Sequence, residues 1–104
     1  MKKKTATSRY QRDVLEYVTT IPRGKVTTYG QIAKDLFLPT PRIVGKILHT
    51  NPDSNKYPCH RVVFSDGSLA PAYAFGGEEV QRKKLSAEGV IFKKKKVNLT
   101  KSLR

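Results

Sequence analysis

Residues 26–49, VTTYGQIAKDLFLPTPRIVGKILH, contain the pattern that decides the fold. Thr28 and Gln31 match a capping box, in which Thr28 accepts from the amide of Gln31 while the Gln31 side chain reaches back. This pattern predicts a short helix over residues 29–36, followed by a turn at FLPT. A second helix then begins at Pro41, whose missing N–H costs nothing at the first helical position. Two short helices joined by a tight turn favour a helix-turn-helix motif.

The second helix, over residues 41–49, is predicted to be capped by Thr40 and to have two different faces. Its apolar face consists of Ile43, Val44, Ile47 and Leu48. Its other face consists of Arg42, Gly45, Lys46 and His49, which recur at helical spacing. A glycine lets the backbone of this basic face approach another surface closely, and DNA is one interpretation of that surface. The alternatives are an ordinary solvated helix face and a glycine that serves helix packing.

The chain carries a large excess of positive charge. Its 104 residues include 21 Lys and Arg against 8 Asp and Glu, a formal net charge of +13. Such an excess favours a nucleic-acid partner, because basic groups near phosphates release condensed counterions. A membrane partner is disfavoured, since the sequence has no long apolar run and no signal-peptide pattern. The single cysteine forms no intramolecular disulfide, so we expect a cytoplasmic protein that works on intracellular DNA.

Length and pattern predict one domain. We expect residues 1–7 to be a flexible basic tail and residues 8–104 to form a single domain. Helices are predicted over residues 8–19 and over EEVQRKKLSAEG, and RVVF is typical of a buried strand. VIF and VNL flank a four-lysine run and are expected to pair as a small ribbon, while residues 101–104 are expected to fray. The fold class is therefore α+β and mainly helical: a winged-helix-like helix-turn-helix domain with a small strand element.

The one cysteine lies in NKYPCHRVVF, residues 55–64. Chemistry at Cys59 requires a base or a positive field, because a free thiol is mostly protonated at neutral pH. His60 is adjacent, but neighbours on an extended segment point to opposite faces, so a bridging water is needed. Glu88 is a candidate partner for the imidazole, since a carboxylate near a helix C-terminus needs a compensating contact. The alternative for Cys59 is a small buried core residue. Zinc is disfavoured, because one cysteine and two histidines lack ligand spacing.

Four ordered blocks resemble one family. PCHRVV resembles the active-site signature of the O6-alkylguanine-DNA alkyltransferases. IPRGKVTTYGQIA resembles that family's entry into its DNA-binding helices, RIVGKILHTNP its recognition helix, and GGEEVQRKKLSAEG its closing helix. The resemblance covers residues 10–92 and leaves out the family's variable N-terminal domain. It implies repair by direct reversal, in which the protein takes an alkyl group from O6 of guanine in a single turnover.

The resemblance also implies catalytic roles. Cys59 would be the nucleophile, His60 the water-mediated base, and Glu88 the group that holds the imidazole. Asn51 would organise the turn behind the site and couple it to the recognition helix. Tyr29 would crowd the 3′ phosphate of the target nucleotide and promote its rotation. Apart from the resemblance, the departing guanine needs a proton, which Tyr29 or a site water could supply.

DNA contacts follow from the same resemblance. Arg42 would enter the duplex and fill the space left by the displaced base, with the recognition helix in the minor groove. Further DNA-binding residues would be Gly45, Lys46, Thr28 and Arg61. The substrate pocket would comprise Val62, Tyr73, Ala74 and Phe75, and the carbonyls of Cys59 and Val62 would receive the guanine edge. We expect a monomer that needs no cofactor or metal.

One loop departs from the family pattern. The family usually has a Tyr and a small residue just before GG, whereas here the stretch is Tyr73-Ala74-Phe75 and the loop is about two residues longer. Phe75 is therefore expected to narrow the pocket or to change which adducts fit. Two alternatives to alkyl transfer therefore stay open. One is a non-enzymatic protein that resembles the alkyltransferase-like class, which binds alkylated guanine and recruits excision-repair proteins; those proteins usually carry tryptophan in place of Cys59. The other is a general DNA-binding module.

Overall fold

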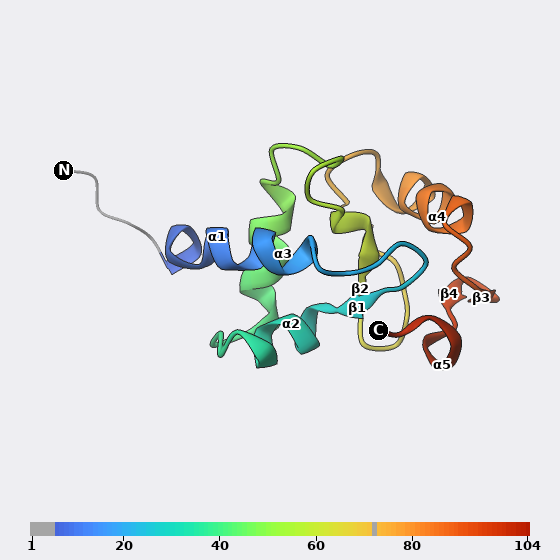
Figure 1. Cartoon of the computed structure of the whole chain (residues 1–104), viewed down its shortest axis with the longest axis horizontal. Coiled ribbons are helices and arrows are strands. Elements are labelled where there is room, and N and C mark those ends of the chain that lie inside the picture. The colour runs from blue at the N-terminus through green and yellow to red at the C-terminus, as the bar shows by residue number, and fades with distance from the viewer. Residues whose placement is uncertain (1–5, 72) are drawn as a thin grey trace.

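The computed structural model describes residues 6–71 and 73–104. Its elements, in chain order, are α1 (Ala6–Val18), β1 (Thr27–Thr28), α2 (Tyr29–Asp35), α3 (Pro41–His49), the 3₁₀ helix η1 (Cys59–Arg61), β2 (Val62–Val63), α4 (Gly77–Ala87), β3 (Phe92–Lys93), β4 (Lys96–Val97) and α5 (Leu99–Ser102) (Figure 1). The fold is thus mainly helical with small strands, as predicted. Among the described helices, none is long and apolar enough to cross a membrane.

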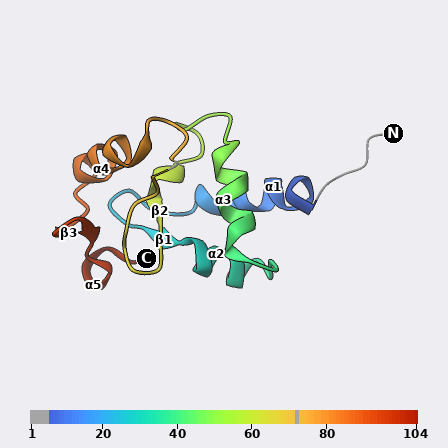
Figure 2. The ribbon, with the colours of Figure 1, turned by 180° about the vertical axis from the view of Figure 1, so that it is seen from behind.

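The helix-turn-helix consists of α2 and α3, and α3 packs against both α1 and α2. Seen from behind, α3 crosses in front of α1 (Figure 2). Thr28 caps α2, since the Gln31 amide donates to its hydroxyl at 3.0 Å. The reciprocal half of the predicted capping box is wrong, because the Gln31 side chain donates to Asp35 at 2.8 Å instead. Thr40 occupies the N-cap position of α3 without a side-chain hydrogen bond.

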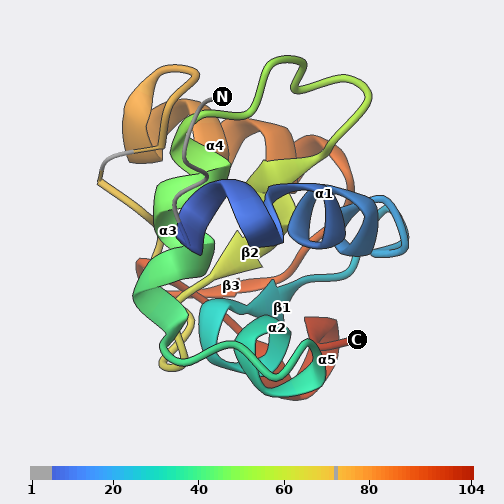
Figure 3. The ribbon, with the colours of Figure 1, turned by 90° about the vertical axis from the view of Figure 1, so that its left-hand side faces the viewer.

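Two small pairs of strands complete the domain. β1 and β2 pair in parallel with Thr27 opposite Val62, which ties the start of the helix-turn-helix to the segment after Cys59. β3 and β4 pair antiparallel across the lysine run, so the predicted ribbon is confirmed. Viewed along the long axis, α1 and α3 lie in front of the β1–β2 pair, with α2 below and α4 above (Figure 3).

The core has two parts. The larger packs α1, α2 and α3 together and includes Val14, Val18, Ile32, Val44, Ile47 and Val62. The smaller joins the C-terminal segments and includes Val26, Val63, Leu69, Leu85, Val90 and Val97. The predicted apolar face of α3 is therefore confirmed, since three of its residues, Val44, Ile47 and Leu48, are buried.

Both ends of the chain differ from expectation. The fraying predicted for residues 101–104 is wrong: the Val26 amide donates to Ser102 at 2.9 Å, and the Arg104 amide donates to Val26 at 2.9 Å. Pairing with a buried residue holds this end in place. The predicted tail over residues 1–7 lies mostly outside the described residues, but its last two residues already belong to α1.

Candidate functional site around Cys59

A pocket of about 830 Å³ is lined both by Cys59 and by residues of the helix-turn-helix. Its walls include Cys59, Tyr29, Arg42, Gly45, Lys46, His49, Tyr73 and Ala74. All four residues of the predicted basic face of α3 therefore border the same space as the cysteine. Residues from four separate parts of the chain meet here: Tyr29, α3, the segment from Cys59 to Phe64 and the loop from Ala70 to Ala74.

Gly45 is open on its outer side. A Cβ placed on this residue would meet no atom within 4 Å among the described residues. The interpretation of Gly45 as a helix-packing residue is therefore wrong. The glycine instead leaves bare backbone on the pocket side of α3, next to the exposed side chains of Arg42 and Lys46.

Cys59 begins a 3₁₀ helix, not the extended segment that we expected. With about three residues per turn, successive side chains point roughly 120° apart, so Cys59 borders the pocket while His60 turns towards α4. The residue is only 4% exposed and also packs in the larger core cluster, so the interpretation as a small buried residue is correct in part.

The electrostatic setting of the thiol differs from the one we expected. Burial raises the pKa of Cys59, against the opposing effects of a hydrogen bond with Asn51, the Lys84 charge and the Tyr73 hydroxyl. The expected positive field is present, but burial outweighs it. Deprotonation of Cys59 at neutral pH therefore depends on a base.

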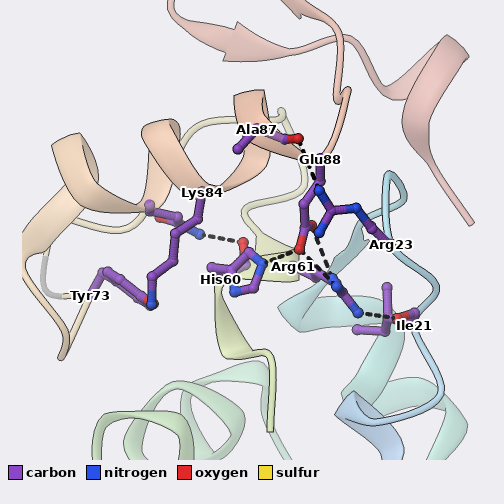
Figure 4. A network of polar contacts seen from close by, with 9 residues as sticks. Ile21, Arg23, His60, Arg61, Tyr73, Lys84, Ala87 and Glu88 are labelled. Atoms are coloured by element: carbon purple, nitrogen blue, oxygen red, sulfur yellow. Dashed lines mark hydrogen bonds and ion pairs between the residues drawn. The ribbon is translucent and has the colours of Figure 1, made fainter. Parts of the chain in front are cut away.

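Glu88 joins two neighbours of Cys59 (Figure 4). Its carboxylate lies 2.9 Å from His60 Nε2 and accepts two hydrogen bonds from Arg61, at 3.0 Å from Nε and 2.7 Å from Nη2. The predicted contact between Glu88 and His60 is confirmed. Arg61, which we assigned to DNA, instead turns its guanidinium towards Glu88 and also donates to the Ile21 carbonyl at 2.8 Å.

The protonation of His60 follows from this contact. Burial alone would raise the pKa of Glu88, but hydrogen bonds from Arg61 and His60 outweigh it and lower the pKa to about 2. An ionised carboxylate only accepts, so His60 Nε2 carries the proton that it donates. Burial lowers the pKa of His60, so the ring is neutral near pH 7 and Nδ1 holds a lone pair. Nδ1 is buried and has no hydrogen-bond partner among the described residues, which suits a proton acceptor.

Asn51 organises the loop between α3 and Cys59, as expected. Its Nδ2 donates to the Tyr57 carbonyl at 2.8 Å, and its Oδ1 accepts from the Asp53 amide at 2.9 Å. Both bonds are partly buried, and Asn51 itself is buried two residues after the end of α3. The side chain therefore ties the end of α3 to the segment that presents the thiol.

Gln81 is a site residue that the sequence analysis missed. It is fully buried on α4, and its Nε2 donates to the carbonyls of His60 at 3.1 Å and Val62 at 3.0 Å. Its Oε1 accepts from the Ala70 amide at 2.9 Å. Val62, whose carbonyl we expect to receive the guanine edge, is fully buried and does not border the pocket, and its carbonyl accepts from Gln81. The sequence does contain one signal for Gln81: it lies four residues before Leu85, which places both side chains on the same, buried face of α4.

The long loop before α4 contributes Tyr73 and Ala74 to the pocket wall, but not Phe75. Phe75 therefore does not narrow the pocket as part of its wall, and its effect on which adducts fit stays a prediction. Its ring packs beside Tyr73, with the ring centroids 5.8 Å apart. Lys84 donates from Nζ to the Tyr73 hydroxyl at 2.9 Å, a second contact that the sequence did not reveal.

Two other predicted residues, Tyr29 and Thr28, differ in their relation to the pocket. Tyr29 borders the pocket, with its ring centroid 5.0 Å from that of Phe64. Burial, with the Cys59 charge, raises the pKa of Tyr29 to about 12, so its phenol remains a proton donor. Thr28 does not border this pocket, and its hydroxyl caps α2.

Within the described part of the chain, no cluster of His, Cys, Asp and Glu could hold a metal ion.

The sequence and the fold match a known family of DNA-binding domains. A family model for the DNA-binding domain of 6-O-methylguanine DNA methyltransferase matches residues 9–90. The chain belongs to this family. It is 42% identical over 81 residues to the methylated-DNA--protein-cysteine methyltransferase of Methanothermobacter thermautotrophicus, an alignment that covers 78% of this chain and 44% of that protein. The chain spans about half the length of the methyltransferases that it matches.

A second group of relatives matches over more of its own length. Alkyltransferase-like protein 1 of Schizosaccharomyces pombe is 39% identical over 79 residues, covering 74% of this chain and 72% of that protein. The crystal structure of S. pombe Atl1 with damaged DNA containing O6-carboxymethylguanine superposes with a TM-score of 0.77 at 31% identity. That superposition covers 100% of this chain and 98% of Atl1.

Proposed function

We propose that this protein binds alkylated duplex DNA and transfers an alkyl group from O6 of guanine to Cys59 in a single turnover. One observation carries the proposal: the Cys59 thiol borders the same pocket as the basic face of α3. A DNA-binding helix and a nucleophile that share one space suit chemistry on a nucleotide turned out of the duplex.

The charge and shape of α3 support the binding step. The bare backbone at Gly45 permits close approach to a minor groove, and Arg42 at the start of the helix can enter the stack. Turning a nucleotide out costs a few kcal/mol, which contacts from Arg42 and the phosphate backbone can offset. Groove contacts of this kind discriminate poorly between sequences, so the proposed binding depends on the lesion more than on its flanks.

The groups at the site account for each bond and each proton in the transfer step. His60 Nδ1 takes the thiol proton through a bridging water, with Nε2 held by Glu88. The Cys59 thiolate then attacks the alkyl carbon, so an S–C bond forms and the C–O6 bond breaks. Guanine leaves with the bonding electron pair and takes a proton from the Tyr29 phenol or a water. The thioether has no exit, so each molecule reacts once.

Intact-protein mass spectrometry tests the transfer. After incubation with excess duplex containing O6-methylguanine, the protein mass should rise by one methyl group, and Cys59→Ser should abolish the gain. Plain duplex serves as the control. An unchanged mass with lesion DNA in excess would overturn the proposal.

A second candidate is a lesion-binding protein without transferase activity that recruits excision-repair proteins. The superposition with Atl1, which extends over the whole of this chain, favours it, as does the burial that raises the pKa of Cys59. This candidate predicts tighter binding to lesion duplex than to plain duplex while the lesion survives. Equal affinity for both duplexes would instead indicate a general DNA-binding module, with a steep dependence on salt.

A further inference from the structure

Lys84 is held in a fixed position behind the pocket. It lies on α4, partly buried, and extends towards Tyr73 (Figure 4). Its Nζ lies 2.9 Å from the Tyr73 hydroxyl, 5.4 Å from the centroid of that ring and 5.6 Å from the centroid of Phe75. A cation between two aromatic rings with a hydrogen bond to one of them is oriented and partly desolvated.

The direction of this hydrogen bond determines where the Tyr73 proton points. An ammonium group has three donors and no acceptor, so the Tyr73 oxygen must accept from Lys84. The phenolic proton is then free for another acceptor. Tyr73 is 8% exposed and borders the pocket that contains Cys59, so its hydroxyl and the thiol line the same space. An interaction between the two groups lowers the pKa of Cys59, against the larger effect of burial.

We propose that Lys84 is a positioning residue for the Cys59 thiolate, which it stabilises by holding the Tyr73 hydroxyl with its proton directed at the sulfur. The thiol proton leaves for His60 as before, and neither Lys84 nor Tyr73 gains or loses a proton. The inference deepens the proposed function, because it concerns the nucleophile of that reaction. Both groups also oppose the effect of burial on the pKa of Cys59.

Other charged or titratable groups face the same pocket. Besides His60 on its own element, the thiol shares the space with Tyr29, Arg42, Lys46, His49 and Tyr73, with Lys84 behind Tyr73. Arg42 and Lys46 are exposed, so solvent weakens their effect on the thiol. Lys84 differs from them because its hydrogen bond to Tyr73 has a fixed direction and is partly buried.

The pH dependence of Cys59 alkylation by iodoacetamide tests this role without DNA. The reagent reacts with the thiolate, so the midpoint of the rate profile reports the thiol pKa. Lys84→Met should move the midpoint upward and slow the reaction at neutral pH roughly fivefold, the value for one hydrogen bond of about 1 kcal/mol. Lys83→Met is the matched control, because Lys83 is the exposed neighbour on the same helix and should leave the profile unchanged.

Two more variants separate orientation from a general loss of structure. Lys84→Arg keeps a donor-only cation and should restore the wild-type midpoint. Tyr73→Phe should reproduce the shift of Lys84→Met, and the double variant should shift no further, because the two groups act in series. If Lys84→Met does not fold, Tyr73→Phe supplies the same comparison, because it removes the hydroxyl through which Lys84 acts.

Three results would overturn the inference: the same profile for Lys84→Met and Lys83→Met, a slower reaction with an unmoved midpoint, or additive shifts in the double variant. A midpoint shift together with no mass gain from lesion DNA would keep the role of Lys84 and remove alkyl transfer. A mass gain from lesion DNA with an unmoved midpoint in Lys84→Met would support alkyl transfer and remove the role of Lys84.

Discussion

His60 Nε2 lies 2.9 Å from Glu88 Oε2, although 28 residues separate the two in sequence. Glu88 is the C-cap of α4, and His60 is the middle residue of η1. The contact therefore joins the closing helix to the segment that presents the thiol. Arg61 neutralises the same carboxylate, which explains how a negative charge is tolerated at a helix C-terminus.

Glu88→Gln should destabilise the protein strongly. The side chains of His60, Arg61 and Glu88 are largely buried, so the variant leaves the Arg61 charge without its carboxylate. We expect the free energy of unfolding to fall by about 3 kcal/mol, as for other broken buried ion pairs. Urea denaturation measures the change, and Glu79→Gln, at an exposed position of α4, is the control. Equal effects of the two substitutions would contradict the structural role of Glu88.

Stability should fall in acid in two stages. The folded state lowers the pKa of His60 below its ordinary 6.5 through burial, so the unfolded state binds more protons below about pH 6.5 and stability falls. The pKa of Glu88 is held at about 2 against an ordinary 4.5, so its contribution is present above 4.5 and is lost as pH falls towards 2. Urea denaturation between about pH 3 and pH 8 follows both stages. The Glu88→Gln variant should lose less stability than the wild type below pH 4.5. An equal loss in the variant would show that Glu88 does not cause the second stage.

Gly45→Ala should separate folding from binding. A Cβ at this position meets nothing within 4 Å, so the variant should be more stable by about 0.5–1 kcal/mol through helix propensity alone. The added methyl group lies on the pocket side of α3, so affinity for duplex DNA should fall. Gly30→Ala is the matched control, because Gly30 is also open but does not border the pocket. Thermal unfolding and fluorescence anisotropy measure the two effects; unchanged affinity would refute close approach at Gly45.

Arg42→Ala should weaken binding to lesion duplex more than removal of a remote surface charge does. Arg42 is exposed at the mouth of the pocket, whereas Lys101 is exposed on α5 and does not border it. Lys101→Ala removes one unit of charge and should change affinity only through the general salt-dependent attraction. Titrations of both variants at one salt concentration make the comparison. Equal losses would argue against insertion of Arg42.

Phe37→Gly should stabilise the protein slightly. Phe37 lies in the turn between α2 and α3 with a left-handed φ of 57° and is 92% exposed, so its side chain adds little packing. Left-handed backbone costs about 1–2 kcal/mol for a residue with a Cβ, and part of the gain is lost to unfolded-state entropy. We expect about 0.5 kcal/mol from denaturant unfolding. Phe37→Ala keeps the Cβ and should bring no gain in stability. An equal gain from Phe37→Ala would show that the exposed ring, and not the left-handed backbone, destabilises the protein.

Local patterns in the sequence predicted much of the fold. Thr28 caps α2, Pro41 begins α3, and the ribbon around the lysine run forms, because capping, helix starts and hairpins depend on neighbouring residues. The basic face of α3 was likewise predictable from helical spacing. The resemblance at PCHRVV directed attention to Cys59, and the contact between His60 and Glu88 was expected on the same basis.

Other parts of the site depend on contacts between distant residues. No local pattern shows that Arg61 turns inward to Glu88, that Gln81 bonds the carbonyl of Val62, or that Lys84 contacts Tyr73. The loss of solvent around these groups, which decides their protonation and their partners, arises only when α4 packs over η1. The amino-acid sequence alone thus determined the helices and singled out Cys59, whereas tertiary packing decided which polar groups surround that thiol, because burial and long-range hydrogen bonds exist only in the assembled fold.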